Sequence, residues 1–226
     1  MFHTFLKRNL NVLPKDRQKD LENIVKQKRF THFSDRPKHS HIHIDSFLLS
    51  QGVKDCMSWR NSRLGKCVYD FALYPMIIWE NSPATILEIG SGEGASAIWM
   101  ADICKSYNLS TYYATHVYSM DIDPPDIPYN GVTFLRGNSE EIHNIFDVET
   151  LPHPWLIIED AHVNVNGVME YFTKHMHEGD YMIIEDSRGV KGSTLQVPSS
   201  LLVDTYYCDY FGRNATSAMN TILRKE

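Results

Sequence analysis

The sequence contains few cysteines and no long hydrophobic run. Its four cysteines form no Cys-x-x-Cys pair and no zinc-ligand spacing, which argues against a disulfide framework or a zinc site and predicts reduced thiols. No uninterrupted apolar stretch approaches the roughly 18 to 20 residues that a membrane span needs, and charges interrupt the N-terminus too early for a secretory leader. We therefore expect a cytoplasmic protein without a membrane partner.

Basic residues are also in short supply. The 226 residues carry a formal net charge of −6, whereas binding to nucleic-acid phosphates needs a surplus of Lys and Arg, so we expect no nucleic-acid partner. One N-terminal stretch, KRNLNVLPKDRQKDLENIVKQKRF, is locally cationic, and we interpret residues 16–28 as a helix with a solvated face rather than a phosphate or membrane contact. The length and the 42% hydrophobic composition predict one α/β core with an attached segment.

Short apolar runs alternate with longer mixed segments from residue 84 onwards. This alternation predicts a mostly parallel sheet covered by helices on both faces, which is a doubly wound, Rossmann-like α/β fold. We expect a helix over residues 66–80, in which Pro75 either starts a second helix or introduces a kink. Further helices are expected near residues 94–106, 139–147 and 164–177. Residues 1–58 are expected to form a helical or irregular N-terminal extension, and residues 59–226 the main domain.

A glycine-rich turn follows the first of these apolar runs, in ATILEIGSGEGASAIWMAD. Glycines between a strand and a helix let a ligand approach main-chain N–H groups at the helix N-terminus. Gly90, Gly92 and Ala95 fit the degenerate pattern of dinucleotide-binding loops, so NAD is one interpretation and a purely structural turn is another. Asp121 or Asp123, at the next strand end, would suit the ribose hydroxyls of any such nucleotide.

Two apolar runs end in the same Glu-Asp pair, in PWLIIEDAH and GDYMIIEDS. Because parallel strands end at one edge of a sheet, where ligands bind, four carboxylates are expected close together there: Glu159, Asp160, Glu185 and Asp186. Like charges this close raise one another's pKa, and a divalent cation would remove that cost. Oxygen ligands favour Mg²⁺, with Mn²⁺ or Ca²⁺ as further options, over Zn²⁺. The alternative is that these carboxylates are solvated strand ends or helix caps.

Histidines occur at two places of interest. His162 follows the first Glu-Asp pair, and an imidazole with an unperturbed pKa of about 6.5 can take a proton near neutrality. His162 is therefore our candidate general base, the alternative being an ordinary structural histidine. His39, His41 and His43, in HSHIHID, alternate in a way that would place all three on one face of a strand. We interpret that segment as an exposed connector, with a metal site as the alternative.

The form Glu-x-Gly-x-Gly-x-Gly at the glycine turn resembles motif I of class I S-adenosylmethionine methyltransferases. More widely, the chain from about Trp59 to the C-terminus is similar to the cephalosporin hydroxylase and rhamnosyl O-methyltransferase family. The resemblance is carried by WRNSRLGKCVYDFALYPMIIW, ILEIGSGEGASAIWMAD, MDID, LRGNS, IIEDAH and EGDYMIIEDS. In the first of these, Lys66 and Asp70 lie near a Lys-x-Pro-x-Asp element of the family, although its proline is absent. The N-terminal 58 residues and the segment after Ser187 resemble the family little.

This resemblance implies an S-adenosylmethionine-dependent, Mg²⁺-assisted O-methyltransferase that acts on a hydroxyl of a sugar or another small natural product. It implies a set of cofactor-binding residues, the last two at the adenine ring: Glu88, Gly90, Ser91, Gly92, Gly94, Asp121, Asp123, Asn138 and Ser139. Glu185 and Asp186 match the family's metal-binding pair by position. The third ligand is Glu159 if the spacing from His162 decides, or Asp160 if the residue type decides.

The segment after Ser187 is expected to cover the acceptor. Four aromatic residues there either line the acceptor site or pack ordinarily: Tyr206, Tyr207, Tyr210 and Phe211. Two other functions stay open, a metal-dependent hydroxylase or oxidoreductase of the same family and a non-catalytic cofactor-binding scaffold. No 2-His-1-carboxylate arrangement is evident near the strand ends, which counts against the hydroxylase. The expected partner is a small-molecule acceptor, for which a saccharide is a candidate, and a homo-oligomer is compatible with the sequence.

Overall fold

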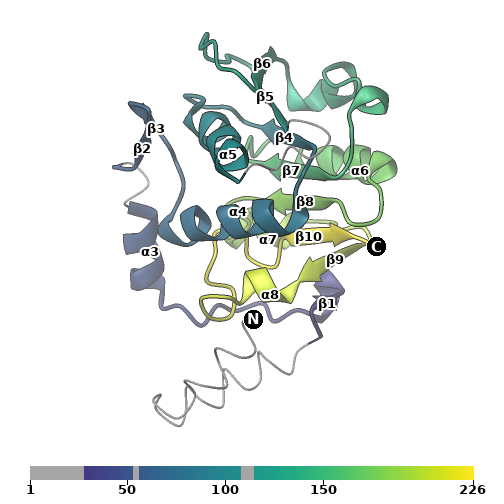
Figure 1. Ribbon diagram of the computed structural model, residues 1–226. Helices are drawn as coiled ribbons and strands as arrows, with labels where there is room; N and C mark the ends of the chain where they lie inside the picture. The colour runs from purple at the N-terminus through teal and green to yellow at the C-terminus, as the bar shows by residue number, and fades with distance from the viewer. Residues whose placement is uncertain (1–27, 53–55, 108–114) are drawn as a thin grey trace.

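The computed structural model describes residues 28–52, 56–107 and 115–226 of the chain (Figure 1). These residues build an eight-stranded sheet in the order β1-β9-β10-β8-β7-β4-β5-β6. Five neighbouring strands are parallel: β6 (Val132–Arg136), β5 (His116–Asp121), β4 (Thr85–Ile89), β7 (Trp155–Glu159) and β8 (Tyr181–Ile184). Three more continue the sheet with antiparallel pairing: β10 (Ile222–Lys225), β9 (Leu201–Asp204) and β1 (Phe30–Thr31). The mostly parallel sheet predicted from the sequence is confirmed.

Helices cover both faces of the parallel half of the sheet (Figure 1). α5 (Ala95–Ser106) follows β4, and α6 (Val165–His175) follows β7. From β4 the chain moves to β5 in one direction, and from β7 it moves to β8 in the other, so right-handed crossovers place α5 and α6 on opposite faces. α4 (Val68–Asn81) packs beside α5, and the 3₁₀ helix η4 (Ser139–Asn144) packs beside α6. A second 3₁₀ helix, η5 (Val148–Thr150), precedes β7.

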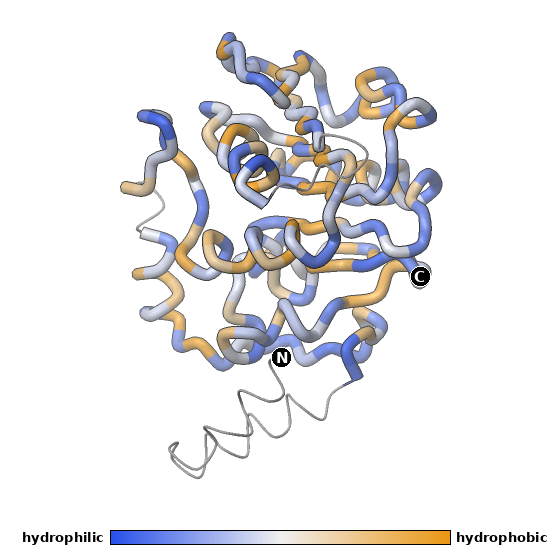
Figure 2. Tube along the Cα trace, viewed as in Figure 1, coloured by the Kyte–Doolittle hydropathy of each residue, from blue (hydrophilic) through white to orange (hydrophobic). Residues whose placement is uncertain are grey.

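The core is centred on β4 and β7, whose residues are all buried. Central parallel strands are buried on both faces, which explains why their sequences read as nearly continuous apolar runs. In Figure 2 the strands in the middle of the molecule are largely hydrophobic, whereas many of the peripheral loops are hydrophilic. The large indoles of Trp99 on α5 and Trp155 on β7 are at most 2% exposed and fill the two sides of this core.

α4 confirms the helix expected over residues 66–80. The helix continues through Pro75, so this proline does not start a second helix. The inner side of α4 is set by apolar residues at helical spacing, Leu73, Tyr74 and Ile77, all at most 2% exposed. α5, η4 and α6 likewise lie where the sequence predicted helices, although η4 is a 3₁₀ helix.

Part of the N-terminal segment packs onto the main sheet. β1 pairs antiparallel with β9, and the 3₁₀ helix η2 (Phe33–Asp35) follows it. Arg36 is buried and donates two hydrogen bonds to the Asp209 carboxylate, at 2.9 and 2.7 Å. α3 (Ile44–Gly52) comes next. Except for its last residue, the helix expected over residues 16–28 lies outside the described residues.

Three short pieces complete the fold around the edge where the parallel strands end. The hairpin of β2 (Ser58–Trp59) and β3 (Ser62–Arg63) lies beside α5 (Figure 1). α7 (Gly189–Thr194) follows β8, and α8 (Thr205–Cys208) follows β9. Within the described residues, no helix is both long enough and apolar enough to cross a bilayer.

Candidate active site

The glycine-rich turn between β4 and α5 lies against the end of β7. Gly90 has a φ of +106°, and a Cβ at this position would lie 2.7 Å from the backbone N of Ala161, so only glycine allows this approach. Gly92, with a φ of +48°, has no atom other than its chain neighbours within 4 Å of where a Cβ would lie. Gly94, with a φ of +80°, is the N-cap of α5. The turn is therefore packed on one side and open on the other.

Glu88, near the end of β4, is directed into the protein. It is fully buried, and its two carboxylate oxygens accept hydrogen bonds of 2.5 Å from the hydroxyls of Ser96 and Ser119. Burial raises the pKa of Glu88. Glu88 thus connects β4 with β5 and with the start of α5, behind the open side of the glycine turn.

The two aspartates expected at the ribose lie in different surroundings. Asp121 ends β5, and its Oδ2 accepts a hydrogen bond of 3.1 Å from the backbone N–H of Gly92. The side chain of Asp123 is 87% exposed and forms an ion pair of 3.1 Å with Arg136. Only Asp121 of the two contacts the glycine turn.

The two residues expected at the adenine ring belong to the start of η4. Asn138 caps this helix by accepting a hydrogen bond of 3.0 Å from the N–H of Glu140. Ser139 is buried and donates a hydrogen bond of 3.0 Å to the carbonyl of Val163. Both side chains therefore shape the loops near the end of β7.

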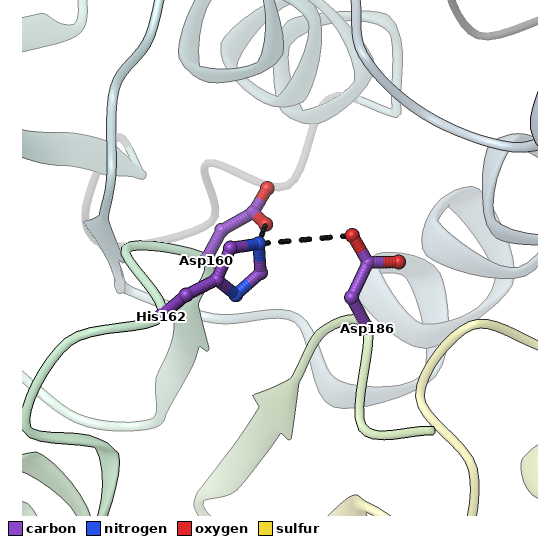
Figure 3. A group of neighbouring side chains, drawn as sticks. All are labelled: Asp160, His162 and Asp186. Carbon is purple, nitrogen blue, oxygen red and sulfur yellow. Dashed lines mark ion pairs between the residues drawn. The ribbon is translucent and has the colours of Figure 1, made fainter. Parts of the chain in front are cut away.

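Three side chains at the ends of β7 and β8, Asp160, His162 and Asp186, form a cluster that could hold a metal ion (Figure 3). We call them the outer cluster. Nε2 of His162 lies 3.6 Å from Oδ1 of Asp160 and 3.7 Å from Oδ2 of Asp186, and one potential ligand atom of each residue lies within 4.8 Å of the others. No other group of this kind occurs in the described part of the chain. His39, His41 and His43, for which a metal site was the alternative interpretation, are exposed and do not form one.

The two glutamates next to these aspartates point the other way. Glu159 and Glu185, which we call the inner glutamates, are at most 4% exposed. Glu185 Oε1 lies 2.6 Å from the ammonium of Lys66 and also accepts a hydrogen bond from the Tyr74 hydroxyl. Glu159 Oε2 lies 2.8 Å from the ammonium of Lys191. In each Glu-Asp pair the glutamate is buried and the aspartate belongs to the outer cluster, because the chain turns away from the sheet here: β7 ends at Glu159, β8 ends at Ile184, and Asp186 has a φ of +48°.

Lys66 is the positive charge beneath the cluster. Its side chain is 1% exposed, and besides Glu185 it contacts Oδ2 of Asp160 at 3.0 Å. Burial lowers the pKa of Lys66, but the charges of Asp160 and Glu185 outweigh this and raise it well above its usual value. Burial, and next the charge of Asp160, raise the pKa of Glu185, while Lys66 opposes them. The Lys66 ammonium therefore offsets part of the repulsion between these carboxylates. From the sequence alone, a metal ion was expected to offset that repulsion.

Lys191, on α7, holds the other side of the cluster. Its Nζ contacts Nδ1 of His162 at 2.7 Å and the carbonyl of Glu185 at 2.5 Å, besides Glu159. The backbone of His162 has a φ of +61°, in the left-handed region, and its N–H donates a hydrogen bond of 2.8 Å to Oε1 of Glu159. Backbone and ring of His162 are thus both fixed, with Nε2 directed at the two aspartates.

Two cavities meet at the outer cluster. The first, of about 340 Å³, runs along the glycine turn and is lined by Gly90, Ser91, Gly92 and Asp121 among others. The second, of about 560 Å³, extends along α6 and α7. His162 and Asp186 line both cavities. The four aromatic residues for which the sequence left open either a place in the acceptor site or ordinary packing line neither cavity: Tyr206, Tyr207, Tyr210 and Phe211.

Comparison with known families distinguishes between the functions that the sequence left open for this chain. The family described as rhamnosyl O-methyltransferase/CmcI matches residues 51–200, well over half of the chain. The chain belongs to this family. A search of the curated proteins gave no match. The predicted family resemblance is confirmed, and so is the predicted enzyme class, an O-methyltransferase.

Solved structures of CmcI support the same assignment. A CmcI structure with S-adenosylhomocysteine (SAH) is 26% identical, covers 88% of this chain and 100% of its own, and has a TM-score of 0.62. One with Mg and S-adenosylmethionine (SAM) is 25% identical, covers 91% and 94%, and has a TM-score of 0.61. The predicted doubly wound fold is thus the CmcI fold. The predicted cofactors, SAM and Mg²⁺, are those named for the second of these CmcI structures, and the first is named with SAH, the product of SAM.

Two lysines of this rhamnosyl O-methyltransferase/CmcI family member were not predicted as partners of the carboxylates. Lys66 was noted only as part of the family resemblance, and Lys191 lies in RGVKGST, where no motif or periodicity distinguishes it. The only signal was indirect, since four neighbouring carboxylates need positive partners. That need does not say which lysines of the chain will meet it.

Proposed function

We propose that the chain transfers the methyl group of SAM to a hydroxyl of a small-molecule acceptor, beside a divalent cation. The observation that carries this proposal is the meeting of the two cavities at His162 and Asp186. One cavity follows the glycine turn, and the other leads away along α6 and α7. A methyl donor and an acceptor bound in the two cavities would therefore face each other at these side chains, which is the positioning that in-line methyl transfer needs.

The cavity at the glycine turn suits SAM by its backbone and its charge. Gly90 and Gly92 leave main chain accessible, and Ser91 lines the same wall. Asp121 is placed to accept hydrogen bonds from ribose hydroxyls. We assign Glu88 and Gly94 to shaping the turn from behind, whereas a role for Asp123, Asn138 and Ser139 at the nucleoside stays a prediction.

The outer cluster is our proposed cation site, with Asp160 and Asp186 as the protein ligands. These are the two carboxylates that line the cavity at this point, where Oδ1 of Asp160 faces His162 while its Oδ2 contacts Lys66; the inner glutamates are buried and do not line the cavity. Carboxylate oxygens suit Mg²⁺ or Mn²⁺. Such a cation would supply Lewis-acid polarisation that lowers the pKa of the acceptor hydroxyl. The sequence left Glu159 and Asp160 open as the third ligand, and we propose Asp160. We also propose that Glu185, which the family resemblance implied as a ligand, does not bind the cation.

His162 is our proposed proton acceptor for the hydroxyl. Its Nε2 faces the two aspartates, at the junction of the cavities, and its Nδ1 faces Lys191. To accept a proton at Nε2, the neutral ring must carry its hydrogen on Nδ1. The Lys191 ammonium would then direct its hydrogens to the Glu159 carboxylate and the Glu185 carbonyl. Glu159, which also accepts the backbone N–H of His162, and Lys191 would thus position His162 rather than bind the metal.

The second cavity is our proposed acceptor site. Its walls combine the amides and hydroxyl of Asn164, Asn166 and Thr194 with the apolar side chains of Val165, Val190 and Leu195. A lining of this mixed kind suits a molecule with hydroxyl groups and an apolar face, such as a sugar or a glycosylated natural product. A saccharide acceptor is also consistent with the rhamnosyl part of the family description.

The proposal is tested by binding and transfer measurements on the unchanged protein. We expect SAH to bind in calorimetry, and we expect deuterated methyl groups to pass from labelled SAM to at least one member of a panel of sugars and glycosides. Chelation of divalent cations with EDTA should abolish the transfer. Binding of NADH or 2-oxoglutarate in place of SAH would instead support the oxidoreductase alternative, which the outer cluster disfavours because it contains one histidine.

Two further predictions, the location of the protein in the cell and its oligomeric state, remain proposals as well. We propose a cytoplasmic location, which the four free cysteines support because free thiols suit a reducing compartment. Homo-oligomerisation is a prediction that light scattering of the purified protein would decide.

A further inference from the structure

The cavity along the glycine turn carries an uneven set of charges. Four carboxylates line it: Glu93, Asp121, Asp160 and Asp186. Among the described residues that line this cavity, Arg63 is the only Lys or Arg. An anionic group placed here would be repelled by every other ionised side chain of the wall, so its position is restricted to the neighbourhood of Arg63.

The proposed cofactor has one such anionic group. The methionine part of SAM carries a sulfonium and an ammonium, which suit the acidic wall, and an α-carboxylate, which does not. A carboxylate is bound best by a guanidinium, whose planar set of N–H donors can contact both oxygens at once. The chemistry of the cavity therefore assigns the carboxylate to the guanidinium of Arg63, the only one among the described residues that line the cavity.

The hairpin that carries Arg63 is fixed to α5. The indole N–H of Trp59 donates a hydrogen bond of 2.9 Å to the Asp102 carboxylate, and Arg60 contacts the same carboxylate at 2.8 Å. Arg63 follows on β3, the second strand of this hairpin. The hairpin is thus held by contacts with α5 that do not involve the cavity.

Arg63 reaches the glycine turn through Glu93. Its backbone N–H donates a hydrogen bond of 3.0 Å to Oε2 of Glu93, and its Nε lies 3.7 Å from Oε1. Both side chains are 57% exposed, and an ion pair this long and exposed is weak. The guanidinium is therefore accessible to a ligand carboxylate that enters the cavity.

We propose that Arg63 binds the α-carboxylate of the methionine part of the cofactor. This assignment rests on the proposed function, since it needs SAM or SAH in the cavity of the glycine turn. It makes the β2–β3 hairpin part of the cofactor site, although the hairpin precedes the Rossmann-like part of the chain. It also gives the acidic cavity a polarity, with the carboxylate at the hairpin and the sulfonium towards the outer cluster.

The experiment compares two probes that differ in the amino-acid part. SAH contains the α-carboxylate, whereas 5′-methylthioadenosine has the same nucleoside and thioether but no amino acid. Calorimetry on the unchanged protein and on Arg63→Met should show that the substitution weakens SAH binding by about 10- to 100-fold, the size expected for a charge-assisted contact. Binding of 5′-methylthioadenosine should stay within about twofold, and Arg63→Lys should restore part of the SAH affinity.

Lys174→Met is the matched control, because it removes a positive charge from a side chain of α6 that is 65% exposed and lies outside the cavity lining. Its SAH affinity should stay within about twofold. Equal weakening of both probes by Arg63→Met would overturn the inference, because it would reveal a structural role of the hairpin. Unchanged SAH affinity in Arg63→Met would overturn it while leaving the proposed function intact. Failure of the unchanged protein to bind either probe would overturn both.

Discussion

The ends of β7 and β8 carry the same Glu-Asp pair, yet the two residues of each pair lie in different layers. The inner glutamates, Glu159 and Glu185, are buried and contact Lys191 and Lys66. Asp160 and Asp186 belong to the outer cluster and line the cavity of the glycine turn. The inner layer is paired with lysines of the chain itself, whereas the outer layer, in which Asp160 shares Lys66 with Glu185, lies where ligands can enter.

This difference teaches that the position within a motif matters more than its residue type. Glu and Asp offer the same functional group, and the turn of the backbone after each strand decides which of the two faces solvent: β7 ends at Glu159, and Asp186, after β8, has a φ of +48°. Two lysines contact three of the four carboxylates, Lys66 with both Glu185 and Asp160 and Lys191 with Glu159, so the site keeps a net negative charge that a cation can offset. Four substitutions test this division, and they are arranged here from the largest expected effect to the smallest.

Lys66→Met should have the largest effect, and it should act on folding. It would leave the Glu185 carboxylate buried without its cation, and removal of one partner of a buried ion pair costs roughly 3–5 kcal/mol of unfolding free energy. Urea unfolding measures the loss. Lys174→Met, at a side chain of α6 that is 65% exposed, is the control and should change the stability by less than about 0.5 kcal/mol. Equal stabilities of the two variants would contradict the role of Lys66 in the inner layer.

Asp186→Asn should mainly affect cation binding. It removes a negatively charged oxygen from the outer cluster, so the affinity for Mn²⁺, used as a spectroscopic substitute for Mg²⁺, should fall by about 100-fold or more, beyond the typical effect of a supporting residue. Electron paramagnetic resonance of free Mn²⁺ measures this affinity. Asp123→Asn, at an exposed strand-end aspartate outside the cluster, is the control. A similar loss in both variants would show that Mn²⁺ responds only to net charge.

His162→Ala should lower turnover by about 10²-fold, the usual contribution of a general base. Because the cofactor cavity keeps its glycine turn and Asp121, SAH binding should stay within about twofold of the unchanged protein. Steady-state methylation and calorimetry measure the two quantities. Wild-type turnover in this variant would remove His162 from the proton transfer.

Glu159→Gln should have the smallest effect on cation binding, with a loss of Mn²⁺ affinity below about tenfold. The glutamine amide oxygen can still accept the hydrogen bond from the His162 backbone N–H, while the ion pair with Lys191 is lost. The main change should therefore appear in turnover. A loss of Mn²⁺ affinity as large as that of Asp186→Asn would place Glu159 among the metal ligands, in agreement with its spacing from His162.

The parallel half of the molecule could be predicted from the sequence because its signals are local. β4, β7 and β8 are apolar runs, each is followed by a mixed segment, and acidic residues lie at or just after the ends of β4, β5, β7 and β8. Parallel pairing then brings the ends of β7 and β8 to one edge without further information. The glycine turn could be predicted for the same reason, because its three glycines follow the strand at every second position. All three adopt positive φ in the structure.

The antiparallel half could not be predicted in the same way. β1 is two residues long and pairs with β9, which lies far along the chain, so no local pattern marks it. β9 and β10 each cover four residues and follow segments without clear periodicity. The partners of the inner glutamates were hidden for a related reason, because Lys66 and Lys191 reach them only through the folding of α4 and α7 onto the sheet edge.

The most direct test of the two-layer site is the position of a cation in crystals grown with SAH and Mn²⁺. The anomalous signal of manganese should lie about 2.0–2.2 Å from oxygens of Asp160 and Asp186, with Lys66 still on Glu185 and Lys191 still on Glu159. A manganese ion bonded to Glu159 or Glu185, with the lysine displaced from that carboxylate, would contradict the division into an inner and an outer layer.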